Sequence, residues 1–174
     1  MKKAVSTFLL ILCIADGLAQ GTEPKQGSFF HPNSVQLEFF SFSAEYALNY
    51  ERTIFNRSRF KTLGLVGVCR TSDGYNFPGL TIPIALNELF SFNRHHAEFG
   101  LTYNHFLTWY ANDVSSASGT YYVSGRIAYR YQKPNGRFIF RLSYAPVLYA
   151  NFLQYFRDRY KPPVNISIGY AFGK

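Results

Sequence analysis

The chain has 174 residues, enough for one domain or one small barrel, and a formal net charge of +8. Its basic residues are scattered rather than gathered on one face, which argues against nucleic-acid binding; attraction to anionic lipid headgroups is another use for them. Aromatic residues make up 19% of the chain, yet mean hydropathy is only −0.11. No apolar run of about 20 residues follows residue 19, which excludes a helical membrane protein. These values fit a membrane β-barrel, because half of each strand is polar.

Residues 1–19 have the layout of a cleavable signal peptide. Lys2 and Lys3 provide the positive start, and the apolar stretch Ala4–Ile14 is too short to span a bilayer. Small residues at Gly17 and Ala19 predict cleavage after Ala19. The protein is therefore expected to be exported.

The cysteines allow one alternative. Cys13 would suit a lipoprotein, but Leu12 stands where a lipobox needs a small residue. The mature chain keeps only Cys69, so no disulfide framework can form. We expect Cys69 to be a small packed side chain within a strand.

After a lead-in without regular structure over 20–33, strand-like segments and turn signals alternate to the end of the chain. The pattern predicts an all-β fold, a closed antiparallel eight-stranded transmembrane barrel over 34–174, preceded by the signal peptide. The expected strands cover 34–42, 45–54, 60–70, 80–89, 96–110, 120–132, 137–149 and 164–172.

Alternation with a period of two is clearest in the last segment. Val164, Ile166, Ile168, Tyr170 and Phe172 share one face, and small or polar residues share the other. The same pattern in the other segments predicts that the apolar face looks outward at lipid.

Two segments follow the pattern poorly. In 60–70 we expect Leu63 and Leu65 to point outward and Gly64 inward. In 80–89 the apolar face is clear, but Pro83 lacks a ladder hydrogen bond and predicts a local bulge.

The connections predict how the barrel is oriented. They are short after the second, fourth and sixth segments and longer after the third, fifth and seventh. An even strand count puts both termini on one side, and short periplasmic turns with longer external loops are usual in such barrels. Within 149–160, Phe152, Phe156 and Tyr160 continue a four-residue spacing from Leu148, which indicates either a short amphipathic helix or an extended strand followed by irregular loop.

The opposite face of the strands carries charge. Glu38, Glu51 and Glu98, with Arg126, Arg130 and Arg141, are predicted to point into the lumen. An eight-stranded barrel has an interior just wide enough for side chains, and enclosed charges must pair. We expect these six residues to form a network that plugs the barrel; a gate or binding site is the alternative.

Residue patterns for metal binding or catalysis are weak. His95 and His96 are adjacent on a strand, so they face opposite ways and chelate poorly. His105, near Tyr103 and Trp109, suits an aromatic girdle at the membrane interface. Neither an H-x-S pair nor a nucleotide-binding motif occurs, and neighbouring Asn104 and His105 point apart. We therefore expect no catalytic residues, metal or cofactor.

Three segments carry a resemblance to a family: Tyr46–Arg52, Tyr129–Pro134 and Ile168–Phe172. From Ser34 to its end, the chain resembles the small eight-stranded outer-membrane β-barrel proteins common in Bacteroidota. The resemblance implies insertion by the barrel assembly machinery, for which members use a terminal aromatic residue as a signal. Here two residues follow Phe172.

The sequence thus predicts a monomeric integral protein of the outer membrane with a structural or surface-interaction role. Its partners would be outer-membrane lipid, lipopolysaccharide and, during insertion, the assembly machinery. A narrow solute pore and a lipid-modifying enzyme are the alternatives in function. A soluble periplasmic lipocalin-like barrel is the alternative in fold, and it would turn the apolar face inward.

Overall fold

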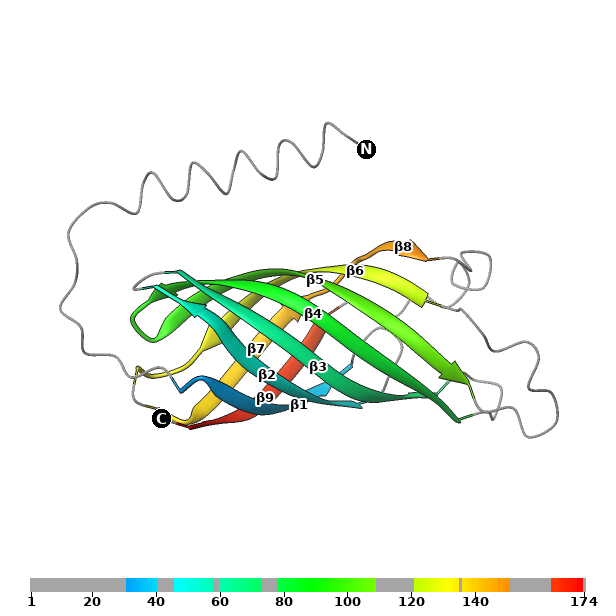
Figure 1. Cartoon of the computed structure of the whole chain (residues 1–174), viewed down its shortest axis with the longest axis horizontal. Coiled ribbons are helices and arrows are strands. Elements are labelled where there is room, and N and C mark those ends of the chain that lie inside the picture. Colours follow the sequence, from blue (N-terminus) through cyan, green and yellow to red (C-terminus); the bar gives the residue numbers. More distant parts are fainter. Residues whose placement is uncertain are drawn as a thin grey trace, which may run out of the picture.

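A computed structural model of the chain describes residues 31–40, 46–57, 60–72, 78–108, 121–134, 136–150 and 164–173. The strands are β1 (Asn33–Phe39), β2 (Tyr46–Asn56), β3 (Phe60–Ser72), β4 (Pro78–Phe92), β5 (His95–Thr108), β6 (Tyr121–Tyr131), β7 (Phe138–Tyr144), β8 (Val147–Ala150) and β9 (Val164–Phe172). They wrap into one tilted barrel (Figure 1). No helix in these ranges is long and apolar enough to cross a membrane.

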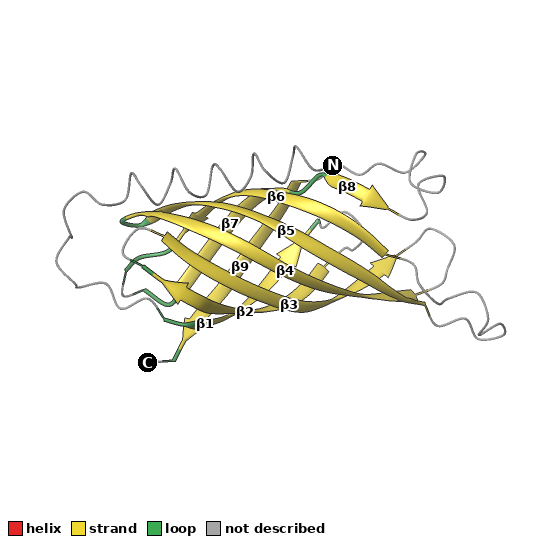
Figure 2. Ribbon diagram, turned by 45° about the horizontal axis from the view of Figure 1, so that its top comes forward, coloured by secondary structure: helices red, strands yellow, loops and turns green. Residues whose placement is uncertain are grey.

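The barrel is closed and antiparallel, as the sequence predicts. Sheet order is β5-β4-β3-β2-β1-β9-β7-β6, and β5 pairs with β6 to close the ring (Figure 2). β7 and β8 both pair with β6, so together they occupy one of the eight strand positions of the barrel. The break between β7 and β8 is at Ala145 and Pro146, where the Gly125 amide donates to the Pro146 carbonyl at 2.9 Å.

The two ends of the barrel differ. One end, which we call the turn end, carries the connections 57–59, 93–94 and 132–137 and both ends of the barrel chain. There Asn33 pairs with Phe172, and His31 Nδ1 lies 2.7 Å from the Gly173 carbonyl oxygen. The opposite loop end carries 40–45, 73–77, 109–120 and 151–163. β3 and β4 reach further than expected, leaving only 73–77 between them.

Outward and inward faces follow the predicted alternation in most strands. Leu48, Ile84 and Ile127 are each more than half exposed on the outer face. Asn49 and Arg130, from the opposite set, are almost fully buried. The barrel therefore presents apolar side chains outside and polar ones inside.

The predicted orientation of β3 was wrong. Leu63 and Leu65 are buried, whereas Val66 and Val68 face outward with 46% and 40% of their surface exposed. Both alternate sets of this strand are apolar or small, so the pattern could not say which faces inward. Leu63 is fully buried, as are Leu89 on β4 and Ile139 on β7.

The bulge predicted at Pro83 is also absent. Residues 67 and 68 of β3 lack partners opposite Ile82 and Pro83, but the register resumes without a shift. The proline therefore interrupts the ladder without adding a residue, because it lacks an amide hydrogen. Register shifts occur elsewhere: in β2, Ile54 is the extra residue between Thr53 and Phe55, and in β8, Leu148 is the extra residue between Val147 and Tyr149.

Several predictions fall outside the described ranges. The signal peptide and most of the lead-in lie in residues 1–30. Of the stretch with helical spacing, Leu148 and Tyr149 belong to β8, and 151–163 is not described.

Candidate functional site

The charged interior is the most distinctive site of the barrel. Glu38 extends inward from β1, Glu51 from β2 and Glu98 from β5; the three arginines come from β6 and β7. All six side chains point into the barrel, and each residue is at most 6% exposed. The structure brings together all six residues expected in the lumen: Glu38, Glu51, Glu98, Arg126, Arg130 and Arg141.

Glu51 joins two arginines from neighbouring strands. Arg130 Nη1 donates to its Oε1 at 2.5 Å, and Arg141 Nη2 donates to its Oε2 at 2.6 Å. Ser34 Oγ adds a longer bond of 3.3 Å to Oε1. Short hydrogen bonds between ionised groups are the strongest kind in proteins, so Glu51 ties β2 to β6 and β7 across the lumen.

Glu98 lies among all three arginines. Arg141 Nε is 3.2 Å from its Oε2, while nitrogens of Arg126 and Arg130 are each 4.0 Å from the carboxylate. Its residue surface is fully buried. Removing this charge would leave an excess of buried guanidinium groups.

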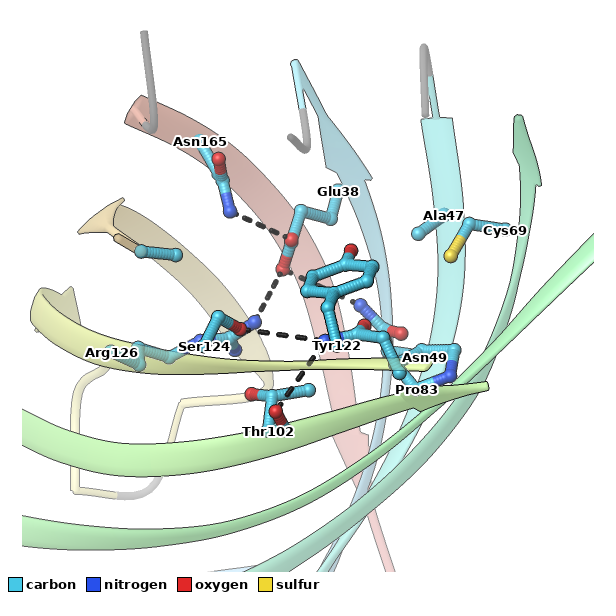
Figure 3. Close-up of a pocket in the computed structure, with 12 residues that line it drawn as sticks. Glu38, Ala47, Asn49, Cys69, Pro83, Thr102, Tyr122, Ser124, Arg126 and Asn165 are labelled. Carbon is cyan, nitrogen blue, oxygen red and sulfur yellow. Dashed lines mark hydrogen bonds and ion pairs between the residues drawn. The ribbon is translucent and has the colours of Figure 1, made fainter. Parts of the chain in front are cut away.

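Glu38 anchors the part nearest the loop end (Figure 3). Arg126 Nη2 donates to its Oε2 at 3.2 Å, and Asn165 Nδ2 donates to its Oε1 at 3.0 Å. Asn49 and Ser167 contribute longer bonds of 3.5 Å and 3.4 Å. The carboxylate therefore links β1 to β2, β6 and β9.

Three carboxylates and three guanidinium groups balance in formal charge. Burying an ion costs several kcal/mol unless it is paired and hydrogen-bonded. Mutual pairing places all six groups beside an opposite charge and fills the middle of the lumen with side chains. Glu38 and Glu51 are also hydrogen-bonded, whereas neither Glu98 oxygen has a hydrogen-bond partner in the described structure. The ion pairs can hold strands together electrostatically. The ionisable groups of the network are therefore engaged with one another.

A small cavity with both polar and apolar side chains in its lining adjoins Glu38 and Arg126 of the network (Figure 3). Its volume is about 20 Å³, and its lining includes Glu38, Asn49, Thr102, Arg126 and Asn165. Several lining atoms have no hydrogen-bond partner in the described structure, among them Arg126 Nε and Thr102 Oγ1. A space of this size holds about one or two water molecules.

Nearer the turn end, further polar side chains are buried in the barrel, among them Lys61 and Gln132, which the sequence reasoning did not single out. The Arg130 guanidinium donates to Gln132 Oε1 at 2.8 Å and 3.2 Å. His96 Nε2 lies 3.1 Å from the Gln132 carbonyl oxygen, and Lys61 Nζ donates to Ser91 Oγ at 3.3 Å. The alternation indicated that His96 and Gln132 point inward, but Lys61 lies on β3, whose orientation was predicted wrongly. The partners of these residues on other strands were not visible in the sequence.

The histidines and the cysteine have structural surroundings. His95 faces outward, 2.6 Å from the Tyr129 hydroxyl, so it and inward-facing His96 lie on opposite faces as predicted. In the described ranges, no group of three or more His, Cys, Asp and Glu residues could hold a metal ion. Cys69 is buried beside Ala47, and its Sγ lies 3.5 Å from the Thr81 carbonyl oxygen.

Aromatic side chains gather outside the barrel near both ends. Near the turn end, Phe90 lies with its ring centroid 5.0 Å from that of Phe60 and 6.0 Å from that of Phe99. Near the loop end, Tyr121 lies 5.4 Å from Tyr103 and 6.0 Å from Tyr149 by the same measure. His105 stacks on Tyr103, within this second group, whereas Trp109 lies outside the described residues.

No family model, curated protein or solved structure matches the chain.

Proposed function

We propose that this chain is an integral outer-membrane β-barrel protein with a structural or surface-interaction role, its lumen closed by the Glu/Arg network. The observation that carries the proposal is the polarity of the wall. Side chains that a water-soluble barrel would bury face outward, and the charges face inward. The fold and the inverted polarity also agree with the resemblance to small outer-membrane barrels.

The outward apolar surface is continuous across the neighbouring strands β1 to β5. In the strand register, Val35 lies beside Tyr50, Tyr50 beside Val66, Val66 beside Ile84 and Ile84 beside Tyr103. All five side chains are between 37% and 53% exposed. Exposed apolar patches on soluble monomers rarely exceed a few hundred Å². A belt that crosses this many strands fits the hydrocarbon layer of a bilayer.

The aromatic groups near the two ends support the same placement. Aromatic rings favour the two membrane–water interfaces, where one part of the side chain meets lipid and another meets water. Near the turn end, the Tyr50 hydroxyl donates to Asn33 Oδ1 at 2.7 Å, and Arg137 Nη1 donates to the Tyr170 hydroxyl at 2.6 Å. These polar contacts lie where headgroups would begin.

The interior favours a closed barrel over a solute pore. The paired charges span the lumen, and the cavity above them has room for only about one or two water molecules. We therefore propose a non-enzymatic barrel whose external loops meet lipopolysaccharide or another surface partner, since the paired interior groups hold the wall together.

Fractionation of cells expressing the full sequence tests the proposal. We expect the protein in the outer-membrane fraction, resistant to an alkaline wash, and extracted only by detergent. Unheated samples should migrate differently from boiled samples on a denaturing gel, because the closed barrel resists detergent. Recovery in the soluble periplasmic fraction without detergent would overturn it.

A further inference from the structure

The barrel topology gathers basic side chains at the turn end. Arg57, Arg94, Lys133 and Arg137 lie in the three turn-end connections, and Arg52 lies near the end of β2. All five are exposed. These residues are far apart in the sequence, so only closure of the barrel places them around one rim.

Acidic residues are distributed in the opposite way. The described part of the chain contains four carboxylates; Glu38, Glu51 and Glu98 are inside, and Glu88 accepts a 3.0 Å hydrogen bond from Thr62. No described carboxylate lies within ion-pair distance of Arg52, Arg94, Lys133 or Arg137. In the sequence, 52–62, 91–96, 131–138 and 172–174 contain no Asp or Glu, whereas each loop-end connection contains one: Glu45, Asp73, Asp113 and Asp158.

Three of the cations lie on neighbouring turns. The Gln132 amide donates to the Arg94 carbonyl at 2.9 Å, which places Arg94 beside the turn that carries Lys133. That turn is closed by the Gly136 amide, which donates to the Lys133 carbonyl at 2.9 Å. The Ala171 amide donates to the Arg137 carbonyl, fixing Arg137 against β9. We call Arg94, Lys133 and Arg137 the basic cluster.

The basic cluster adjoins outward aromatic side chains. The Arg137 guanidinium carbon lies 5.7 Å from the centre of the Tyr170 ring, and His95 lies beside both Tyr129 and Tyr131. Rings of this kind sit at headgroup level in membrane proteins. The cations thus lie at the level of lipid phosphates, whose negative charge attracts them.

We propose that the basic cluster binds the headgroups of anionic phospholipids in the leaflet that surrounds the turn end. This rests on the proposed function, because it needs the barrel to be in a bilayer. Charge complementarity selects a net-negative glycerophospholipid, such as phosphatidylglycerol, over a zwitterionic one. Binding is electrostatic, so it weakens as salt shortens the screening length.

Native mass spectrometry tests the proposal. The protein, expressed from its full sequence and purified from membranes, is held in micelles doped with equal amounts of phosphatidylglycerol and phosphatidylcholine of the same chain length. We expect phosphatidylglycerol to be retained preferentially, and the variant R94Q/K133Q/R137Q to lower that preference at least about fivefold, the effect of roughly one surface cation. Raising the salt concentration in the wild-type sample should lower it as well.

Two control variants separate charge from structure. R94K/R137K keeps the charges and should retain the preference within about twofold, well below the effect of one surface cation. R70Q removes an exposed cation near the loop end and should also leave it unchanged. If the triple variant does not fold, R94Q alone and the salt dependence of the wild type carry the test.

Equal retention of the two lipids by the wild type would overturn the proposal, as would a triple variant that keeps the full preference. Such results would leave the proposed function intact if the protein still fractionates with the outer membrane. Failure of the wild type to enter membranes at all would overturn both.

Discussion

Replacing Glu51 with glutamine removes one interior charge at nearly constant volume. Its two short bonds, 2.5 Å to Arg130 and 2.6 Å to Arg141, would become bonds to a neutral amide. One amide nitrogen would also face a guanidinium donor. Three buried guanidinium groups would then share two carboxylates, Glu38 and Glu98.

Removing one partner of a buried ion pair destabilises proteins by about 3–5 kcal/mol. Glu51 has two such partners, and its residue surface is 2% exposed, so water does not replace the lost charge. We expect E51Q to lower the free energy of unfolding by about 3–5 kcal/mol. Because the penalty comes from unpaired arginine, E51Q/R130Q should be more stable than the sum of the single effects predicts.

Equilibrium unfolding by urea in lipid vesicles measures these free energies, with gel migration of unheated samples as the readout of the folded barrel. E88Q is the matched control, because Glu88 faces outward and its described hydrogen bonds are to the Thr62 hydroxyl. E88Q should change the free energy of unfolding by less than about 1 kcal/mol. Equal stability of E51Q and E88Q would refute the interpretation of the interior as an ion-paired support.

Three further changes test the wall and the lumen. L101R places a cation on the outward face, where the cost is about 2–4 kcal/mol, so insertion into vesicles should fall while L101F inserts normally; equal insertion would contradict the outward apolar belt. G100A puts a Cβ 2.8 Å from the Leu86 carbonyl oxygen, so it should destabilise the barrel by about 1–3 kcal/mol. G125A is the control, because its Cβ would meet Leu148 at 3.5 Å and should not destabilise the barrel. Similar unfolding curves for the two variants would count against the close approach of β4 and β5. Planar-bilayer recordings of the wild type should show no discrete conductance, and regular current steps would show that the lumen is open.

Strands with clear alternation were read correctly from the sequence. In β6, Tyr129 is outside and Arg130 inside, as the polar and apolar sets indicate. In β3, Leu63 and Val66 are both apolar, so the phase of the strand was undetermined and was predicted wrongly. The interruption at Pro146 likewise could not be placed, because it depends on how β7 and β8 share the edge of β6.

The sequence by itself determined which residues of most strands share a face, because a period of two assigns alternate residues to opposite faces. It predicted the closed antiparallel barrel, and the pairing of β5 with β6 confirmed it. It also marked which charges would be enclosed. Only the tertiary structure decided that Glu51 pairs with Arg130 and Arg141, and that Arg94 lies beside Lys133. These contacts depend on the stagger between strands and on closure of the barrel, which set the positions of residues along the barrel axis. Neither the stagger nor the closure is encoded in any single segment.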